Sequence, residues 1–180
     1  FVRQHPFVDL RIDRGIGVVK AYTTRVGEGP LPTEFPGALM ERIRTKGKEF
    51  GATTGRPRRC GWFDAIVARH AVWVNGCHAI AVTKLDVLDE MEMIQLCVGY
   101  RDGTRTIEEF PADLALLDRC VPIYESLPGW RSDTSEVERF EDLPAAAQRY
   151  LKRLEALLGV PICLISIGSK RAQTFKLGQW

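Results

Sequence analysis

The pattern of apolar and polar residues divides the chain into alternating strands and helices. Short apolar segments that are partly β-branched and bounded by glycine or charged residues predict buried strands. Such strands are expected at residues 15–22, 78–83 and 162–167. Residues 39–48 predict a short helix, and residues 62–75 predict a longer one whose apolar side chains follow three- and four-residue steps. Strands that alternate with helices indicate an α/β layer architecture.

Turn residues mark two further elements. Residues 93–100 and 104–110 lie on either side of Arg101-Asp102-Gly103, where Asp-Gly predicts an antiparallel hairpin. Residues 143–158 predict a helix with alanine and leucine on one face, and Gly159 provides its stop signal. The expected fold is therefore α/β with one antiparallel hairpin added.

Composition adds few constraints to this picture. Apolar residues make up 45% and charged residues 27% of the 180 residues, which is typical of one folded domain. The formal net charge of +2 is too small to indicate nucleic-acid binding, and no apolar run approaches the roughly 20 residues of a membrane-spanning helix. Charged residues interrupt residues 1–12, which therefore do not match a signal peptide.

Five scattered cysteines predict reduced thiols and a cytoplasmic location.

The densest candidate for chemistry is the sequence GATTGRPRR at residues 51–59. Its glycines and proline oppose a helix, and it carries two hydroxyl groups and three guanidinium groups. Guanidinium groups bind carboxylates and phosphates through two parallel hydrogen bonds. Taken alone, the pattern fits an anion-binding loop, a solvated basic loop or an RNA contact equally well.

Two more candidates follow predicted strands, at the edge where open α/β sheets bind ligands. Thr83-Lys84-Leu85-Asp86 has the form of a guanine-specifying motif: the carboxylate accepts hydrogen bonds from the base, and the lysine stem lies against it. The alternative is a surface Lys-Asp turn. Ser166-Ile167-Gly168 follows the last strand and fits either the other edge of a base or an ordinary turn. A third loop, residues 23–30, fits a ribose or phosphate contact or a tight turn around a paired Arg25.

Considered together, these segments resemble the adenylosuccinate synthetase family from about Gly15 to Arg171. The matching segments are VVKAYTTRVGEGPLPTE (18–34), GATTGRPRRCGWFD (51–64), TKLDVLD (83–89), CVGYR (97–101), PIYESLPGW (122–130) and YLKRLEALLGVPI (150–162). The combination of the second and third segments is highly specific.

The resemblance implies the C-terminal portion of a mixed-sheet, P-loop-NTPase-like GTP-binding fold, with helices on the sheet faces and an antiparallel hairpin. It also implies an enzyme of purine biosynthesis: GTP phosphorylates IMP, and L-aspartate then displaces the phosphate to give adenylosuccinate, with Mg²⁺ assisting. The family acts as a cytoplasmic homodimer, and neither nucleic acid nor membrane is an expected partner.

The resemblance also assigns roles to residues. The aspartate and IMP sites would include Val26, Ala52, Thr53, Thr54, Gly55, Arg56, Pro57 and Arg58. The GTP site would include Arg58, Lys84, Leu85, Asp86, Ser166, Ile167 and Gly168. The family wording near ISTGPDR is replaced here by ISIGSKR at residues 165–171, which would alter the base pocket.

Part of the family pattern has no counterpart in this sequence. The glycine-rich phosphate loop with its general base and magnesium ligand, and a later catalytic histidine, do not occur here. We therefore expect no catalytic residue and no metal ligand in this chain. Residues 1–14 form an unmatched segment, and residues 15–180 form the C-terminal portion of the synthetase domain. The alternative function is a non-catalytic module that binds nucleotide or aspartate.

Overall fold

A four-stranded sheet forms the centre of the protein in a computed structural model that describes residues 13–178. Its strand order is β1 (Ile16–Lys20), β5 (Ala79–Thr83), β9 (Ile162–Ser166) and β10 (Thr174–Lys176). The first three strands are parallel, and β10 is antiparallel to β9. The predicted strands at residues 15–22, 78–83 and 162–167 are thus confirmed.

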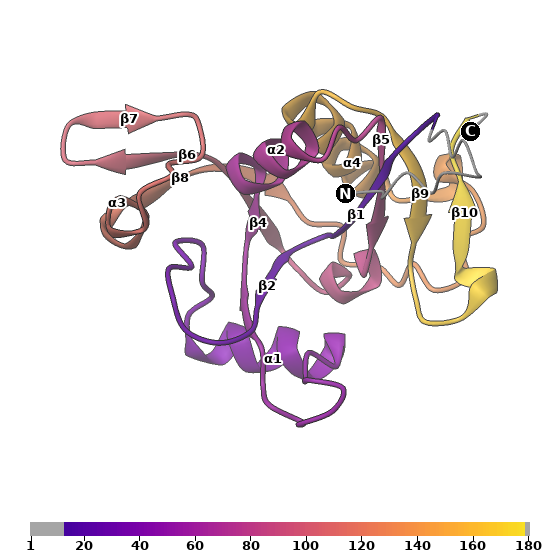
Figure 1. The fold of residues 1–180 in the computed structure, drawn as a ribbon. Helices are drawn as coiled ribbons and strands as arrows, with labels where there is room; N and C mark the ends of the chain where they lie inside the picture. The colour runs from indigo at the N-terminus through magenta and orange to yellow at the C-terminus, as the bar shows by residue number, and fades with distance from the viewer. Residues whose placement is uncertain (1–12, 179–180) are drawn as a thin grey trace, which may run out of the picture.

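A second sheet extends away from the first as an arm (Figure 1). Its long strand β6 (Met93–Asp102) pairs with β8 (Val121–Pro128), with β7 (Arg105–Ile107) and with the two-residue strand β4 (Phe63–Asp64). The short helix α3 (Leu114–Arg119) lies beside the arm. The predicted hairpin is confirmed, with Asp102 paired to Arg105, so that Gly103-Thr104 forms the turn.

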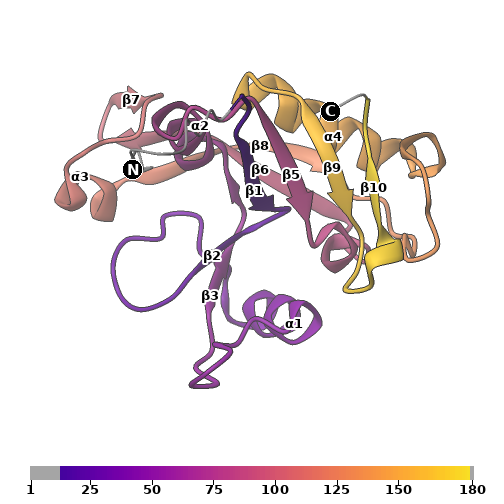
Figure 2. The same cartoon turned by 45° about the vertical axis from the view of Figure 1, so that its right-hand side comes forward.

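A third unit extends below the central sheet in the view of Figure 2. It consists of the strands β2 (Thr23–Arg25) and β3 (Arg59–Gly61), which pair antiparallel, and the helix α1 (Gly37–Gly47). The helix begins two residues before its predicted start and ends one residue before its predicted end.

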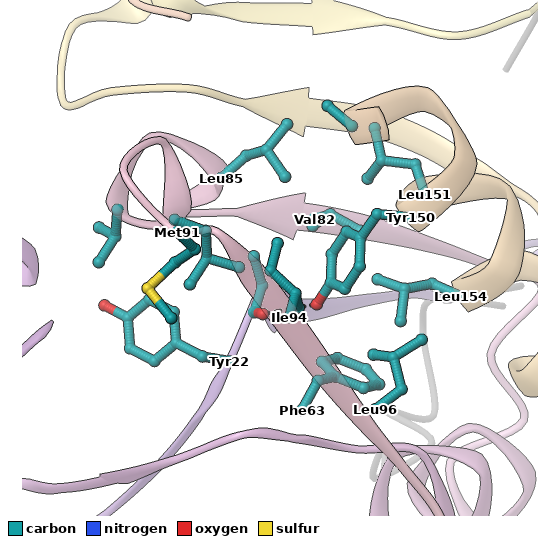
Figure 3. Packing of buried hydrophobic residues seen from close by; sticks show 14 of the residues in the cluster. Tyr22, Phe63, Val82, Leu85, Met91, Ile94, Leu96, Tyr150, Leu151 and Leu154 are labelled. Carbon is teal, nitrogen blue, oxygen red and sulfur yellow. Dashed lines mark hydrogen bonds between the residues drawn. The ribbon is translucent and has the colours of Figure 1, made fainter. Parts of the chain in front are cut away.

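The remaining helices close the core. α4 (Ala145–Leu158) packs Tyr150, Leu151 and Leu154 toward β5 and β6, and Gly159 ends it in the left-handed conformation as predicted (Figure 3). The Tyr150 hydroxyl donates to the Ala21 carbonyl at 2.6 Å and so connects α4 to the end of β1. Three short 3-10 helices, η1 (Leu85–Leu88), η2 (Phe140–Asp142) and η3 (Arg171–Gln173), complete the connections.

The helix predicted over residues 62–75 is shorter than expected. It is α2 (Ala65–Val74), because Phe63 and Asp64 pair with Leu96 and Cys97 of β6 before the helix begins. The Asp64 side chain then caps the helix by accepting from the backbone N–H groups of Ile66 and Val67. The strands and the α-helix that were not predicted are β2, β3, β4, β8, β10 and α3. Most of the predicted unmatched segment, residues 1–14, lies outside the described residues.

The five cysteines are free thiols, as predicted, and four of them are buried. Within residues 13–178, no helix combines the length and apolar character needed to cross a membrane.

Candidate functional site

The loops that follow β5 and β9 meet at one edge of the central sheet. These strands are parallel neighbours, so their C-terminal ends lie side by side. A cavity of about 790 Å³ opens there, which we call the strand-end cavity. Among the residues that line it are four with a predicted role in GTP binding: Lys84, Asp86, Ile167 and Gly168. The fold therefore brings together two segments that are separated by about eighty residues of sequence.

Each residue of the Lys84-Leu85-Asp86 turn points in a different direction. Lys84 has a left-handed backbone (φ 63°), and its ammonium group donates to the Gly47 carbonyl at 2.8 Å. Leu85 is fully buried in the main core and does not line the cavity (Figure 3). Asp86 Oδ1 is buried without a hydrogen-bond partner among the described residues. Burial raises the pKa of Asp86, and the nearby Asp89 carboxylate acts in the same direction.

A buried carboxylate oxygen without a donor is costly unless a ligand supplies one. Asp86 is therefore the polar group of the cavity that most needs a partner. A ligand with N–H donors would satisfy it.

The turn after β9 forms the facing wall of the cavity. The Ser166 hydroxyl donates to the Gly168 carbonyl at 3.0 Å, and Ser166 itself does not line the cavity. A side chain at Gly168 would collide with Gln173, whose amide oxygen accepts from the Lys170 backbone N–H. A larger residue at position 168 would therefore displace the Gln173 side chain and its bond to Lys170.

A third wall comes from residues 130–135, which the sequence did not connect with this site. Trp130 is buried, and its indole N–H donates to Asp89 Oδ1 at 2.7 Å. Thr134 donates to the same carboxylate from its backbone N–H at 2.9 Å. These bonds place Arg131 in the cavity wall, together with Lys46 and Lys48 from the end of α1. Only the tertiary structure identifies these three cations as neighbours of Asp86 in the cavity.

The arginine-rich segment forms a separate hairpin-like loop, which we call the arginine loop (residues 51–58). Bridge contacts between Phe50 and Pro57 close it, and Gly55 turns it with φ 65°. Its tip, residues 52–57, is exposed. Arg56 has no ion-pair partner among the residues that the structure describes, whereas Arg58 binds Glu49 and Arg59 binds Glu34.

Glu49 is a buried carboxylate that the sequence did not single out. It accepts from Lys20 Nζ at 2.7 Å, from the Tyr22 hydroxyl at 2.6 Å and from Arg58 Nη1 at 2.9 Å. Burial opposes ionisation of this carboxyl, but the hydrogen bonds from Lys20, Tyr22 and Arg58 outweigh it and hold the pKa of Glu49 below its usual range. An isolated glutamate between Lys48 and Phe50 has no pattern that would have revealed this role.

The loop after β2 lies next to the arginine loop because β2 pairs with β3, with Arg25 opposite Arg59. The Arg25 guanidinium donates to the Pro30 carbonyl at 2.9 Å, so it is engaged within its own loop. Arg59 Nη1 donates to the Gly29 carbonyl at 2.7 Å and connects the two loops. Val26, the residue with a predicted IMP contact, is exposed between them.

The described residues do not supply a metal site. Within residues 13–178, no group of three or more His, Cys, Asp or Glu side chains could hold a metal ion. The residues present therefore do not fit Mg²⁺, whose protein ligands are carboxylate oxygens, and we derive no step through it.

A family profile, two curated relatives and a solved structure that match this chain all belong to the same family. The profile of the adenylosuccinate synthetase family matches residues 6–175. The adenylosuccinate synthetase of Desulforamulus reducens is 56% identical over 93% of this chain, and that of Heliobacterium modesticaldum is 54% identical over 93%. A structure of fully ligated adenylosuccinate synthetase from Plasmodium falciparum superimposes with a TM-score of 0.87, at 37% identity, over 91% of this chain. In each comparison the chain spans 39% of the relative's length.

Proposed function

Because this chain belongs to the adenylosuccinate synthetase family, we propose that it is the C-terminal portion of an enzyme that ligates L-aspartate to IMP at the expense of GTP. The products are adenylosuccinate, GDP and phosphate, on the route from IMP to AMP. The complete enzyme is a cytoplasmic homodimer that uses Mg²⁺. Its phosphate loop, general base, general acid and metal ligands belong to a portion that has no counterpart in these 180 residues.

The unsatisfied oxygen of Asp86 is the observation that carries this proposal. Guanine has two adjacent donors, the N1–H and the exocyclic amine, which a carboxylate accepts as a pair. Lys84 and Gly168 would border the base, and the cations Lys46, Lys48 and Arg131 in the same cavity would favour a polyphosphate. Leu85 and Ser166 would support the pocket indirectly, through the core and through the turn after β9.

The arginine loop is the proposed aspartate site. Thr53, Thr54 and the uncommitted Arg56 lie at its exposed tip, where a guanidinium group can hold a carboxylate in two parallel hydrogen bonds. Arg58 would face both aspartate and the transferring phosphoryl group, where a cation stabilises developing negative charge. Val26 would contact IMP from the neighbouring loop.

The second candidate is a non-catalytic module that retains nucleotide or aspartate binding. The observation in its favour is that residues 13–178 contain both candidate binding sites but no group of His, Cys, Asp or Glu side chains that could hold a metal ion. The size of the natural gene product separates this candidate from the first, because a product of 20.3 kDa would favour the module and a much larger one the complete enzyme.

The guanine assignment predicts a change of nucleotide preference in Asp86→Asn. The amide presents a donor to the guanine amine, which is also a donor, but it matches the C2 carbonyl of xanthine. In the enzyme completed with its N-terminal portion, we expect kcat/KM for GTP to fall about 10- to 100-fold, since a hydrogen bond to a charged group contributes about 1.5–3 kcal/mol. We expect kcat/KM for xanthosine triphosphate to rise.

Glu90→Gln is the matched control, because it removes one negative charge from the same cavity at an exposed residue that is paired with Lys46. We expect it to leave the GTP-to-XTP ratio unchanged. An unaltered ratio in Asp86→Asn would refute the guanine site.

A further inference from the structure

Glu49 is the meeting point of three elements that bear on the proposed sites. It follows α1 directly, and its carboxylate joins Lys20 at the end of β1, Tyr22 before β2, and Arg58 before β3. Its side chain is only 1% exposed, while those of Lys20 and Arg58 are 24% and 29% exposed. The cations therefore lie between a buried anion and the surface.

The charge and the hydrogen-bond geometry around residue 49 both require a carboxylate side chain. Lys20 Nζ contacts both oxygens of Glu49, at 2.8 and 2.7 Å, and Arg58 shares the second oxygen. An amide at position 49 would offer only one acceptor oxygen, and its NH₂ group would face a cation. Removing one partner of a buried ion pair leaves the other uncompensated, which is strongly unfavourable.

Arg58 is held at one nitrogen and is otherwise uncommitted. Within residues 13–178, Nη1 donates to Glu49 and Nε is buried without a partner. Its backbone is also fixed, since its N–H donates to the Glu49 carbonyl at 2.9 Å and its carbonyl accepts from Arg44 Nε at 2.9 Å. The guanidinium group thus has a defined orientation with donors left over for a ligand.

The same short segment also reaches the strand-end cavity. The Gly47 carbonyl accepts from Lys84 Nζ, and the left-handed backbone of Lys48 (φ 51°) separates this contact from Glu49. Residues 47–49 therefore touch the Lys84-Asp86 turn through one hydrogen bond and Arg58 of the arginine loop through two.

We propose that Glu49 is a positioning residue that holds the Arg58 guanidinium in the orientation required to bind its anionic ligand, and so sets the arginine loop relative to the strand-end cavity. This inference rests on the proposed function for the identity of the ligand. The anchoring of Arg58 does not depend on it.

The first test measures the anchor in the 180-residue chain itself. In Glu49→Gln, we expect the Arg58 Nε–H to exchange with water at least about tenfold faster by NMR, because its guanidinium group is no longer fixed. The Arg59 Nε–H, which is paired with Glu34, is the internal reference and should not change. An unchanged Arg58 exchange rate in a folded variant would overturn the proposal.

The second test measures the consequence in the enzyme completed with its N-terminal portion. A misplacement of about 1 Å can lower a rate about 100-fold, so we expect kcat/KM for aspartate to fall about 10- to 100-fold in Glu49→Gln. Glu49→Asp keeps the charge on a shorter stem, should fold if the amide does not, and should give an intermediate loss. Glu125→Gln, which breaks the remote ion pair with Arg153, is the stability control and should retain wild-type kinetics.

The outcomes separate the two proposals. If the completed wild-type enzyme forms no adenylosuccinate, the proposed function fails, and the exchange measurement alone decides whether Glu49 anchors Arg58. If the wild type is active and both Glu49 variants have wild-type aspartate kinetics, positioning by Glu49 is refuted.

Discussion

At the scale of single residues, the three arginines of the loop at residues 51–59 have different partners. Arg58 binds the buried Glu49, Arg59 binds Glu34, and Arg56 stands exposed with no ion pair among the described residues. The sequence treats all three as equivalent cations. Only the fold shows that Arg56 has its whole guanidinium group available for a ligand.

Arg56 therefore gives a prediction on substrate affinity. Arg56→Leu should raise the KM for aspartate about 10- to 100-fold in the completed enzyme, because a charge-assisted bidentate pair is lost. The free energy of unfolding should change by less than about 0.5 kcal/mol, since the side chain is exposed. Arg56→Lys should recover part of the affinity, and Arg139→Leu, which breaks a surface pair with Asp142, should have no effect on KM. An unaltered aspartate KM in Arg56→Leu would remove the role.

At the scale of elements, α2 shows how a distant strand can override a local helix pattern. Trp62 and Phe63 continue the helical spacing of apolar residues. Phe63 and Asp64 nevertheless form a short strand, because they pair in parallel with β6. Asp64 is then buried and serves two elements, since Oδ1 caps α2 and Oδ2 accepts from the Tyr100 hydroxyl at 2.6 Å. Burial raises the pKa of Asp64 despite these bonds.

Asp64→Ala should lower the free energy of unfolding by about 2–4 kcal/mol. The lost cap accounts for about 1 kcal/mol, and the unsatisfied Tyr100 hydroxyl for about 1–3 kcal/mol. Asp113→Ala is the matched control, since this exposed aspartate caps α3 through one bond to the Ala115 N–H and should cost about 1 kcal/mol or less. Urea unfolding of both variants provides the comparison. Equal losses would show that the bond between Asp64 and Tyr100 contributes nothing.

At the scale of the whole molecule, we propose that recognition and chemistry belong to different portions of the enzyme. Residues 13–178 contain the strand-end cavity and the arginine loop, but no cluster that could hold a metal. Phosphoryl transfer needs a positioned metal and a phosphate cradle. We therefore assign the chemical step to the portion of the relatives that this chain does not span.

This division predicts that the chain alone makes no adenylosuccinate from IMP, aspartate and GTP, and that adding the N-terminal portion of a close relative restores turnover. An absorbance assay of product formation tests both parts. Blotting source extract shows which form occurs naturally: a band well above 20.3 kDa supports the complete enzyme. Turnover by the chain alone would contradict this division of roles. A band at 20.3 kDa would instead favour the non-catalytic module.

Local sequence patterns were sufficient for much of this protein. The three parallel strands, the hairpin, α1, α4 and its Gly159 stop all follow from spacings within about fifteen residues, and such local preferences survive in the fold. The motifs around Arg56 and Asp86 could also be found in the sequence, because in each the distinctive residues lie within a few positions of one another.

Long-range contacts decided the rest. The start of α2 depended on β6, and the pairing of Arg58 depended on Glu49. The place of Arg131 beside Asp86 depended on Trp130 and Thr134 binding Asp89. Each of these contacts satisfies a buried polar group, and the identity of its partner is a property of packing that no local pattern contains.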